Sequence, residues 1–199
     1  MARALEGKHV AFLFTDGVEQ VELMEPLAAV REAGAEAELI SLEQGSVQMF
    51  NHLDKSETIN ADRGISDADA SVYDGLVIPG GVANPDRLRT DAHAVRFVRD
   101  FFAQDKPVGI ICHGPWMLVE SGVANGRTVT SWPSLQTDLR NAGAEWVDRE
   151  VVVDSGLVTS RKPDDLPAFC AKVVEELAEG RHEQRVPAAS ANKHAARAG

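Results

Sequence analysis

The sequence predicts an α/β protein in which a mainly parallel sheet is covered by helices on both faces. Short apolar runs recur along the chain without alternating polar residues, as expected for strands that are buried on both sides. Segments with a helical spacing of apolar residues lie between these runs, and glycines follow several of them. Strands that alternate with helices are joined by right-handed crossovers, and these crossovers produce a parallel sheet.

The predicted strands share a run of apolar or β-branched residues that ends at turn residues. In chain order they are HVAFLF (9–14), EAELISL (36–42), GLVIPGG (75–81) and PVGIIC (107–112). The segment EVVVDSGLVTS (150–160) is predicted to form a hairpin around Asp154, Ser155 and Gly156. Residues 43–72 are polar and rich in Asp, so only short strand-like pieces are expected there.

The predicted helices show apolar residues at helical spacing, and they are residues 18–34, 91–105, 116–122, 134–143 and 163–180. Gly34, Gly122 and Gly180 are placed to end three of them. Pro26 is expected to bend the first helix or to split it in two. The order of strands and helices predicts a doubly wound, flavodoxin-like α/β sandwich with a mainly parallel sheet.

The body and the end of the chain differ in composition. The chain has 199 residues, long enough for one well-cored domain, and its 44% hydrophobic and 26% charged residues are typical of a globular protein. Residues 181–199 are rich in Ala, carry four Lys or Arg against one acidic residue and show no apolar periodicity. We therefore expect a single domain over residues 1–180 and a flexible basic tail over residues 181–199.

The composition excludes several classes of function. A formal net charge of -11 argues against stable binding of nucleic acid or of anionic membranes. No stretch approaches the ~20 apolar residues that span a bilayer, and the first residues lack a signal-peptide pattern. The two cysteines cannot form a disulfide framework, and the histidines show no metal-ligand spacing. These features predict a cytoplasmic protein with reduced thiols and without a metal or other cofactor.

The stretch KPVGIICHGPWML (106–118) carries the strongest indication of chemistry. Cys112 ends a predicted strand, and functional groups collect at the carboxyl ends of strands in open parallel sheets. A sharp turn would set its side chain beside the first N–H groups of the next helix, which favour a thiolate. Gly114 and Pro115 suit that turn and the start of that helix. Cys112 could also be a small core residue, but the neighbouring His-Gly-Pro favours a nucleophile.

His113 is a candidate base or orienting group for the thiol. A histidine in this role needs a third group that fixes its tautomer, and that group must come from elsewhere in the fold. Taken alone, a histidine at this position is more often a solvent-facing residue at the start of a helix.

Two other segments are expected at the same edge of the sheet. Gly80 and Gly81 follow a predicted strand and could donate backbone N–H groups to an oxyanion, or could form only a tight turn. Glu19 and Glu22 lie on one face of a predicted helix. A buried carboxyl there could hydrogen-bond the Cys112 sulfur, although acids in a first helical turn also complement the helix dipole.

Taken together, the Glu pair, the P-G-G turn and the I-C-H-G-P segment resemble the PfpI family (intracellular protease I) of the ThiJ/PfpI superfamily. The similarity continues through GRTVTSWPSLQTDLRNAGAEWVDREVVVDSGLVTSR (126–161) and covers roughly residues 7–179. Several motifs in the same order make the resemblance specific. It implies the class I glutamine amidotransferase-like α/β sandwich.

The resemblance also implies roles for individual residues. Cys112 matches the family nucleophile and His113 its partner. Asp86 matches an acid, Glu in the archetypal members, that orients this histidine from a neighbouring subunit, so at least a homodimer is implied. Glu22 matches the carboxyl that hydrogen-bonds the cysteine, and Glu19 matches a second acid nearby. The backbone of Gly81 and of His113 would form the oxyanion hole.

Family members resemble proteases, cofactor-free glyoxalases and deglycases. All three activities begin with a thiolate that attacks an electrophilic carbonyl. The leading hypothesis is a stress-related cysteine enzyme that detoxifies α-oxoaldehydes such as methylglyoxal or hydrolyses their protein or nucleotide adducts. An intracellular cysteine peptidase is one alternative, and a redox-sensing or chaperone-like stress protein that acts through oxidation of Cys112 is another. A binding-only module is disfavoured because no phosphate-loop fingerprint is present.

Cys170, two tryptophans and Arg161 are further residues that could take part in the site. Cys170 lies within a predicted amphipathic helix and is expected to pack in the core. Trp116 and Trp132 are expected in the core or at an interface, although Trp116 follows the cysteine turn closely enough to line a pocket. Arg161 is expected either to cover the site or to pair with Asp164 or Asp165.

Overall fold

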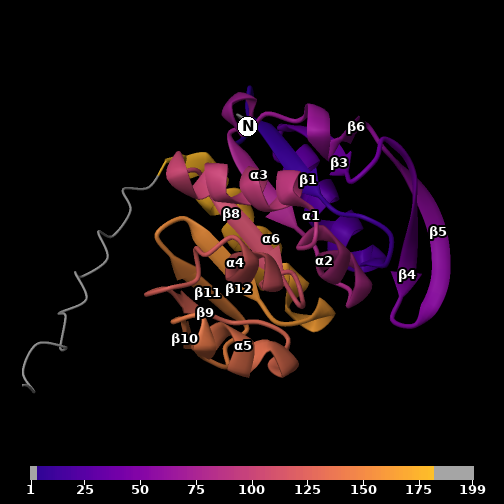
Figure 1. The fold of residues 1–199 in the computed structure, drawn as a ribbon. Coiled ribbons are helices and arrows are strands. Elements are labelled where there is room, and N and C mark those ends of the chain that lie inside the picture. Colours follow the sequence, from indigo (N-terminus) through magenta and orange to yellow (C-terminus); the bar gives the residue numbers. More distant parts are fainter. Residues whose placement is uncertain (1–3, 182–199) are drawn as a thin grey trace, which may run out of the picture.

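The computed structural model describes residues 4–181, and Figure 1 shows how they fold. The predicted tail, residues 181–199, lies outside the described range except for Arg181. A flexible basic tail therefore stays a prediction.

The central sheet has the predicted doubly wound, mainly parallel topology. Neighbouring strands pair in parallel except at one edge, where β11 and β12 form the predicted antiparallel hairpin. The first strand lies inside the sheet rather than at its edge, as a doubly wound order requires. In spatial order the seven strands are β11 (Val151–Asp154), β12 (Leu157–Ser160), β8 (Val108–Ile111), β7 (Gly75–Ile78), β1 (His9–Leu13), β3 (Glu36–Ser41) and β6 (Arg63–Gly64).

Helices cover both faces of this sheet (Figure 1). One hydrophobic core joins the sheet to α1 and α6 and includes Phe12 and Phe169. A second core joins the opposite face to α3, α4 and α5 and includes Phe97, Phe101 and Ile110. The predicted α/β sandwich is thus confirmed. The helices are α1 (Gln20–Glu32), α2 (Ala83–Leu88), α3 (Ala92–Ala103), α4 (Trp116–Glu120), α5 (Gln136–Asn141) and α6 (Leu166–Glu179).

Of the two outcomes expected at Pro26, a bend or a break in the first helix, the break does not occur. Helix α1 runs without interruption from Gln20 to Glu32 with Pro26 inside it. Pro26 is itself buried, and packing of the apolar face of α1 against the core holds the helix despite the missing N–H. The helix also begins two residues later than predicted, because Val18 and Glu19 form the short strand β2.

Residues 43–72 contain a regular hairpin that the sequence pattern did not predict. Strands β4 (Gly45–Asn51) and β5 (Asp54–Ala61) pair antiparallel, and β4 also pairs with β2 (Val18–Glu19) in a second, three-stranded sheet. Figure 1 shows this hairpin standing at one side of the central sheet. Most of β5 is exposed, so its side chains need not be apolar, and the usual signal of a buried strand is missing.

Several short elements were also not predicted. Helix α2 follows the P-G-G turn, strands β9 (Thr128–Val129) and β10 (Glu145–Trp146) form a small two-stranded sheet, and α5 and α6 are each preceded by a 3₁₀ turn. The remaining 3₁₀ turns, η1 (Ile65–Asp67) and η2 (Ala70–Val72), lead into β7. Elements of two to six residues carry too few apolar positions for periodicity to reveal them.

Candidate functional site

The candidate site is built at the carboxyl ends of three adjacent strands. Strand β7 lies between β1 and β8 in the sheet, so the chain segments that leave these strands meet at one edge. The segment after β1 leads to Glu19 and Glu22, that after β7 contains Gly80 and Gly81, and that after β8 begins with Cys112. The structure therefore brings the predicted residues of the site together at this edge, apart from Asp86.

Cys112 occupies a strained turn directly after β8. Its φ of 63° lies in the left-handed region, which non-glycine residues seldom adopt outside turns and functional sites. The residue is 6% exposed. A Cβ on Gly114 would lie 2.7 Å from Ile110 Cγ2 and 2.9 Å from the Ile111 carbonyl oxygen, so this turn accepts only glycine there. The predicted sharp turn around the cysteine is therefore present.

His113 lies against the sulfur of Cys112. Its Nδ1 atom is 3.2 Å from Cys112 Sγ, and its ring stacks on Trp132 with 5.5 Å between ring centroids and 23° between ring planes. Burial lowers the pKa of His113 to about 4. The imidazole is therefore neutral near pH 7 and can accept a proton.

Glu22 is the buried acid of the site. It has no exposed surface, and its Oε2 atom accepts a hydrogen bond of 2.9 Å from the Gly80 N–H. A Cβ on Gly80 would lie 2.4 Å from Glu22 Oε2 and 3.0 Å from Cys112 Sγ, so Gly80 lets carboxyl and sulfur approach each other. The Glu22 Oε1 atom is buried and has no hydrogen-bond partner among the described residues, and the carboxyl interacts electrostatically with the sulfur. Burial, together with the nearby charge of Glu19, raises the pKa of Glu22 to about 8.

The charge states of Cys112 and Glu22 are coupled. Burial raises the pKa of the Cys112 thiol, and the Glu22 carboxylate raises it further. Backbone N–H groups of Gly81 and His113 hydrogen-bond the sulfur and favour the thiolate. At neutral pH both groups therefore hold a proton, and the loss of one proton leaves either thiolate with carboxylic acid or thiol with carboxylate.

The expected effect of a helix start on Cys112 needs correction. Helix α4 begins only at Trp116, four residues beyond the cysteine. It has five residues, which make about one and a half turns. The helix dipole acts within the first turn, so it has little influence on the sulfur. Burial dominates instead, and a thiolate at Cys112 depends on the proton held by Glu22 and on the two backbone donors.

Glu19 supports the site from a distance. It is buried, and its Oε2 atom accepts a hydrogen bond of 2.9 Å from the backbone N–H of His52 at the tip of the β4–β5 hairpin. Its charge favours the protonated form of Glu22. Glu19 therefore acts on Cys112 through Glu22.

The two glycines of the P-G-G turn have different functions. The sequence suggested that the backbone N–H groups of both could bind an oxyanion. The Gly80 N–H already donates to Glu22, so it is not free to bind an oxyanion. Gly81 has a φ of +83°, and a Cβ there would lie 2.3 Å from the Gly17 carbonyl oxygen. Its N–H group points to the Cys112 sulfur, so Gly81 is the available donor of the pair.

Asp86 does not contact His113 within the chain. It lies on α2 with a side chain that is 56% exposed, and it accepts hydrogen bonds of 3.1 and 2.6 Å from the Arg89 guanidinium. The same guanidinium lies over the ring of Trp116, 4.6 Å from its centroid. Whether a second subunit brings Asp86 to His113 stays a prediction.

Two residues of the site were missed at the sequence level. Asn84 is fully buried; its Oδ1 atom accepts from the Thr15 N–H at 2.7 Å, and its amide donates to the carbonyls of Pro79 and Gly80. It fixes the P-G-G turn to the end of β1. Trp132 was expected only in the core or at an interface, yet it stacks on His113. A polar residue just after the turn was a weak signal for Asn84, whereas no spacing indicated Trp132.

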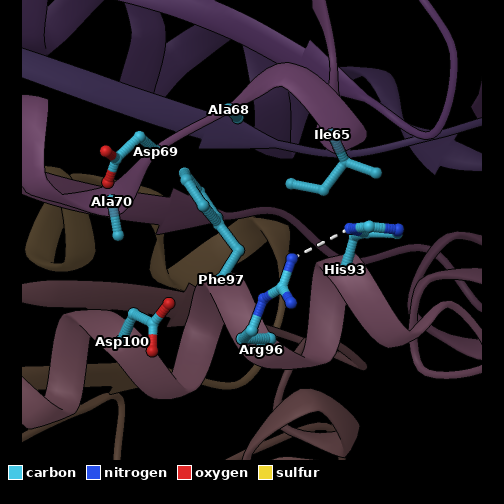
Figure 2. A pocket seen from close by; sticks show the side chains of 8 residues that line it. All are labelled: Ile65, Ala68, Asp69, Ala70, His93, Arg96, Phe97 and Asp100. Atoms are coloured by element: carbon cyan, nitrogen blue, oxygen red, sulfur yellow. Dashed lines mark hydrogen bonds between the residues drawn. The ribbon is translucent and has the colours of Figure 1, made fainter.

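A separate pocket of about 300 Å³ lies between α3 and the η1–η2 segment (Figure 2). Asp69 and Asp100 line one part of it, and Arg96 turns away from them toward His93, with 3.0 Å between Arg96 Nη2 and His93 Nδ1. No cysteine lines this pocket, so it offers no nucleophile.

Residues 4–181 contain neither a cluster of metal-ligating side chains nor a helix that could cross a membrane. No group of three or more His, Cys, Asp or Glu side chains in this range is arranged to hold a metal ion. Within the same range, no helix combines the length and the apolar character needed to cross a bilayer. Arg161 binds Asp165 and Asp148, which agrees with the structural alternative predicted for it.

Comparison with known proteins shows the family of this chain. A family model described as the DJ-1/PfpI family matches residues 8–176. The Bacillus subtilis protein named "Putative cysteine protease YraA" is 44% identical over 162 residues, which cover 81% of this chain and 94% of that protein. "Deglycase TK1284" of Thermococcus kodakarensis is 40% identical and covers 84% of this chain and 98% of its own length. "General stress protein 18" of Bacillus subtilis is 43% identical, with 82% and 94% covered. The chain belongs to the DJ-1/PfpI family.

Proposed function

We propose that this chain is a stress-related cysteine enzyme that acts on small reactive carbonyl compounds. Cys112 is the nucleophile, and the substrates are α-oxoaldehydes such as methylglyoxal or glyoxal, or the adducts that these form with proteins or nucleotides. The proposal rests mainly on one arrangement: a buried sulfur in a strained turn that contacts a neutral imidazole, a protonated carboxyl and backbone donors. The names of two relatives, a deglycase and a general stress protein, support it.

The arrangement suits addition of a thiolate to an aldehyde. Cys112 Sγ attacks the aldehyde carbon and forms a hemithioacetal. The former aldehyde oxygen takes up a proton or accepts a hydrogen bond. The Gly81 N–H, which points to the sulfur, is in place to stabilise the developing oxyanion. Neutral His113 can then move a proton between the two carbon atoms of the former dicarbonyl. Water releases the resulting thioester as a 2-hydroxy acid, so that one dicarbonyl and one water give one acid.

The exposure of the sulfur favours small substrates. Cys112 is only 6% exposed, and the Trp132 ring stacks on its neighbour His113. A two- or three-carbon aldehyde can enter such a recess more easily than a folded protein chain. An adduct would have to present its carbonyl carbon on a flexible side chain.

A cysteine peptidase is the second candidate. It is favoured by the name of the relative that is described as a putative cysteine protease, and the same thiolate and backbone donor would serve amide hydrolysis. A redox-sensing or chaperone-like role is a third, because a protonated Glu22 carboxyl beside the sulfur could donate to an oxidised Cys112. Oxidation to sulfinate under mild peroxide, measured by mass spectrometry, distinguishes this role, since a Cys112 that resists oxidation contradicts it.

We also propose that the protein works as a homodimer or larger homo-oligomer in the cytoplasm. Within one chain His113 has Cys112 and Trp132 beside it, whereas the exposed Asp86 points outward with Arg89. An acid from a second copy would supply the third group that orients the imidazole. No cofactor, nucleic acid or membrane takes part in this proposal.

Substrate assays on one preparation distinguish the activities. The protein is incubated with free methylglyoxal in the presence of a chelator, with an adduct of N-acetylarginine purified from free aldehyde, and with peptide-amidomethylcoumarin substrates. Conversion of methylglyoxal to lactate supports the glyoxalase form, and loss of the purified adduct supports the deglycase form. Cleavage of peptides without conversion of either carbonyl substrate overturns the proposal in favour of a peptidase.

A further inference from the structure

A pocket lies at the edge of the sheet opposite Cys112, where β1, β7 and β8 begin. Its volume is about 190 Å³. Strand β8 separates this edge from Cys112 by its full length, which is about 13 Å for four residues. The pocket is lined by the residues that precede these strands and by the end of α6, among them Lys8, Ser71, Asp74, Lys106, Gly180 and Arg181.

Lys106 forms the buried side of this pocket. The residue is 7% exposed, and its Nζ atom donates to the carbonyl oxygens of Ala70 at 2.7 Å and Ser71 at 3.1 Å. An ammonium has three N–H donors, so one remains for a further acceptor. Burial and the positive charge of Arg181 lower the pKa of Lys106, and an anion in the pocket would counteract both effects.

Two further cations line the pocket. Lys8 Nζ lies 3.7 Å from Asp74 Oδ1 and 4.0 Å from the point that a Cβ on Gly180 would occupy. Arg181 follows Gly180 directly and forms no ion pair with another residue in the range 4–181. Its charge acts on Lys106, and both residues line the pocket.

The local charge is opposite to that of the whole chain. Lys8, Lys106 and Arg181 line the pocket against the single carboxylate of Asp74, with Asp69 also near Lys106. The chain as a whole carries a formal net charge of -11. Cations near the end of a helix such as α6 also complement its dipole. That effect does not require three of them to converge on one cavity, one with its ammonium buried.

We propose that this pocket binds a small phosphate anion, either inorganic phosphate or the phosphate group of a small phosphomonoester. The dianion accepts hydrogen bonds from the remaining N–H of Lys106, from Lys8 and from the guanidinium of Arg181, which matches phosphate oxygens in pairs. A volume of about 190 Å³ lies below the range of sites for larger ligands, so the ligand is small. Binding joins Arg181, at the end of the described chain, to the start of the sheet and does not involve Cys112.

Binding is measured on the full-length protein by isothermal titration calorimetry with inorganic phosphate, with sodium chloride at the same ionic strength as reference. The variants Lys8→Gln and Arg181→Gln each remove one cation from the pocket, and Lys172→Gln removes an exposed cation of α6 that lies outside it. Saturable phosphate binding is expected in the wild type and in Lys172→Gln. Each pocket variant should bind roughly tenfold to a hundredfold more weakly, the loss expected for one charge-assisted hydrogen bond.

Two outcomes overturn the proposal: phosphate that binds no better than chloride, and equal binding by Arg181→Gln and wild type. Folding of each variant is checked by circular dichroism and by an unchanged rate of Cys112 alkylation, since the pocket is remote from the thiol. Glycerol 3-phosphate is titrated in the same way to separate the two sources of phosphate. Tighter binding of the ester assigns the pocket to a phosphomonoester, and weaker binding assigns it to free phosphate.

Discussion

The reactivity of Cys112 depends on a proton that it shares with Glu22. Both groups are buried, and the pKa of each is raised above its ordinary range. Once one proton has left, the pair is either thiolate with carboxylic acid or thiol with carboxylate. The backbone N–H groups of Gly81 and His113 favour the first arrangement, because they donate to a negatively charged sulfur.

The substitution Glu22→Gln tests this coupling. It removes the carboxylate charge that disfavours a thiolate, so the apparent pKa of Cys112 should fall. The measurement is the rate of alkylation by iodoacetamide as a function of pH. Glu32→Gln, which alters an exposed acid of the same helix, is the matched control and should leave the profile unchanged. A profile of Glu22→Gln that superimposes on that of the wild type would falsify the coupling.

At the scale of single residues, the sequence predicted which residues form the site but did not predict the contacts among them. The rule that functional groups collect at the carboxyl ends of parallel strands placed Cys112, Glu22 and Gly81 correctly. The same rule could not tell that the Gly80 N–H binds Glu22, or that burial dominates at Cys112. Both depend on distances between segments far apart in the chain, which no local pattern encodes.

At the scale of elements, close packing of α6 on β8 holds the strand that carries the nucleophile. A Cβ on Gly109 of β8 would lie 2.6 Å from Val173 Cγ2 of α6. The glycine thus permits an approach that any side chain would prevent, and its small size sets the distance between sheet and helix.

The substitution Gly109→Ala should therefore destabilise the protein. Overpacking of this kind costs about 1–3 kcal/mol in the free energy of unfolding. The same change in a Val173→Ala background should cost clearly less, because the clashing methyl group is gone. Urea unfolding of the four proteins of this cycle measures the coupling. Equal costs in both backgrounds would show that the contact between Gly109 and Val173 does not limit the packing.

Buried elements were predictable and exposed or short ones were not. Strands β1, β7 and β8 are buried on both sides, so their composition alone revealed them. Strand β5 is mostly exposed, and its hydrogen bonds to β4 hold it regardless of side-chain polarity. The β4–β5 hairpin still matters for the site, because the His52 N–H at its tip binds Glu19.

At the scale of the whole molecule, the site is incomplete within one chain. Burial alone keeps the pKa of His113 at about 4, and no carboxylate of the described residues offsets this effect. Asp86 remains on the surface beside Arg89. An acid delivered by a second copy would raise the pKa of His113, since a carboxylate within about 4–6 Å stabilises the imidazolium.

The variant Asp86→Asn tests the contribution of a second copy. If Asp86 reaches His113 in the assembly, the wild type loses activity on acidification at a pH well above 4, as the imidazolium forms. The variant should shift this acidic limb of kcat/KM downward by about 1 pH unit or more. Asp67→Asn, another exposed acid, is the control. Identical acidic limbs in wild type and Asp86→Asn would leave Cys112, His113 and Glu22 as a site complete in one chain.

The central claim, that Cys112 carries out carbonyl chemistry, is tested most directly by one comparison. Consumption of methylglyoxal in the presence of a chelator is measured for the wild type, for Cys112→Ala and for Cys170→Ala, which alters the other cysteine within α6. The account predicts that Cys112→Ala loses activity by several orders of magnitude, as expected on removal of a nucleophile, while Cys170→Ala retains it. Turnover by Cys112→Ala at the wild-type rate would contradict the account.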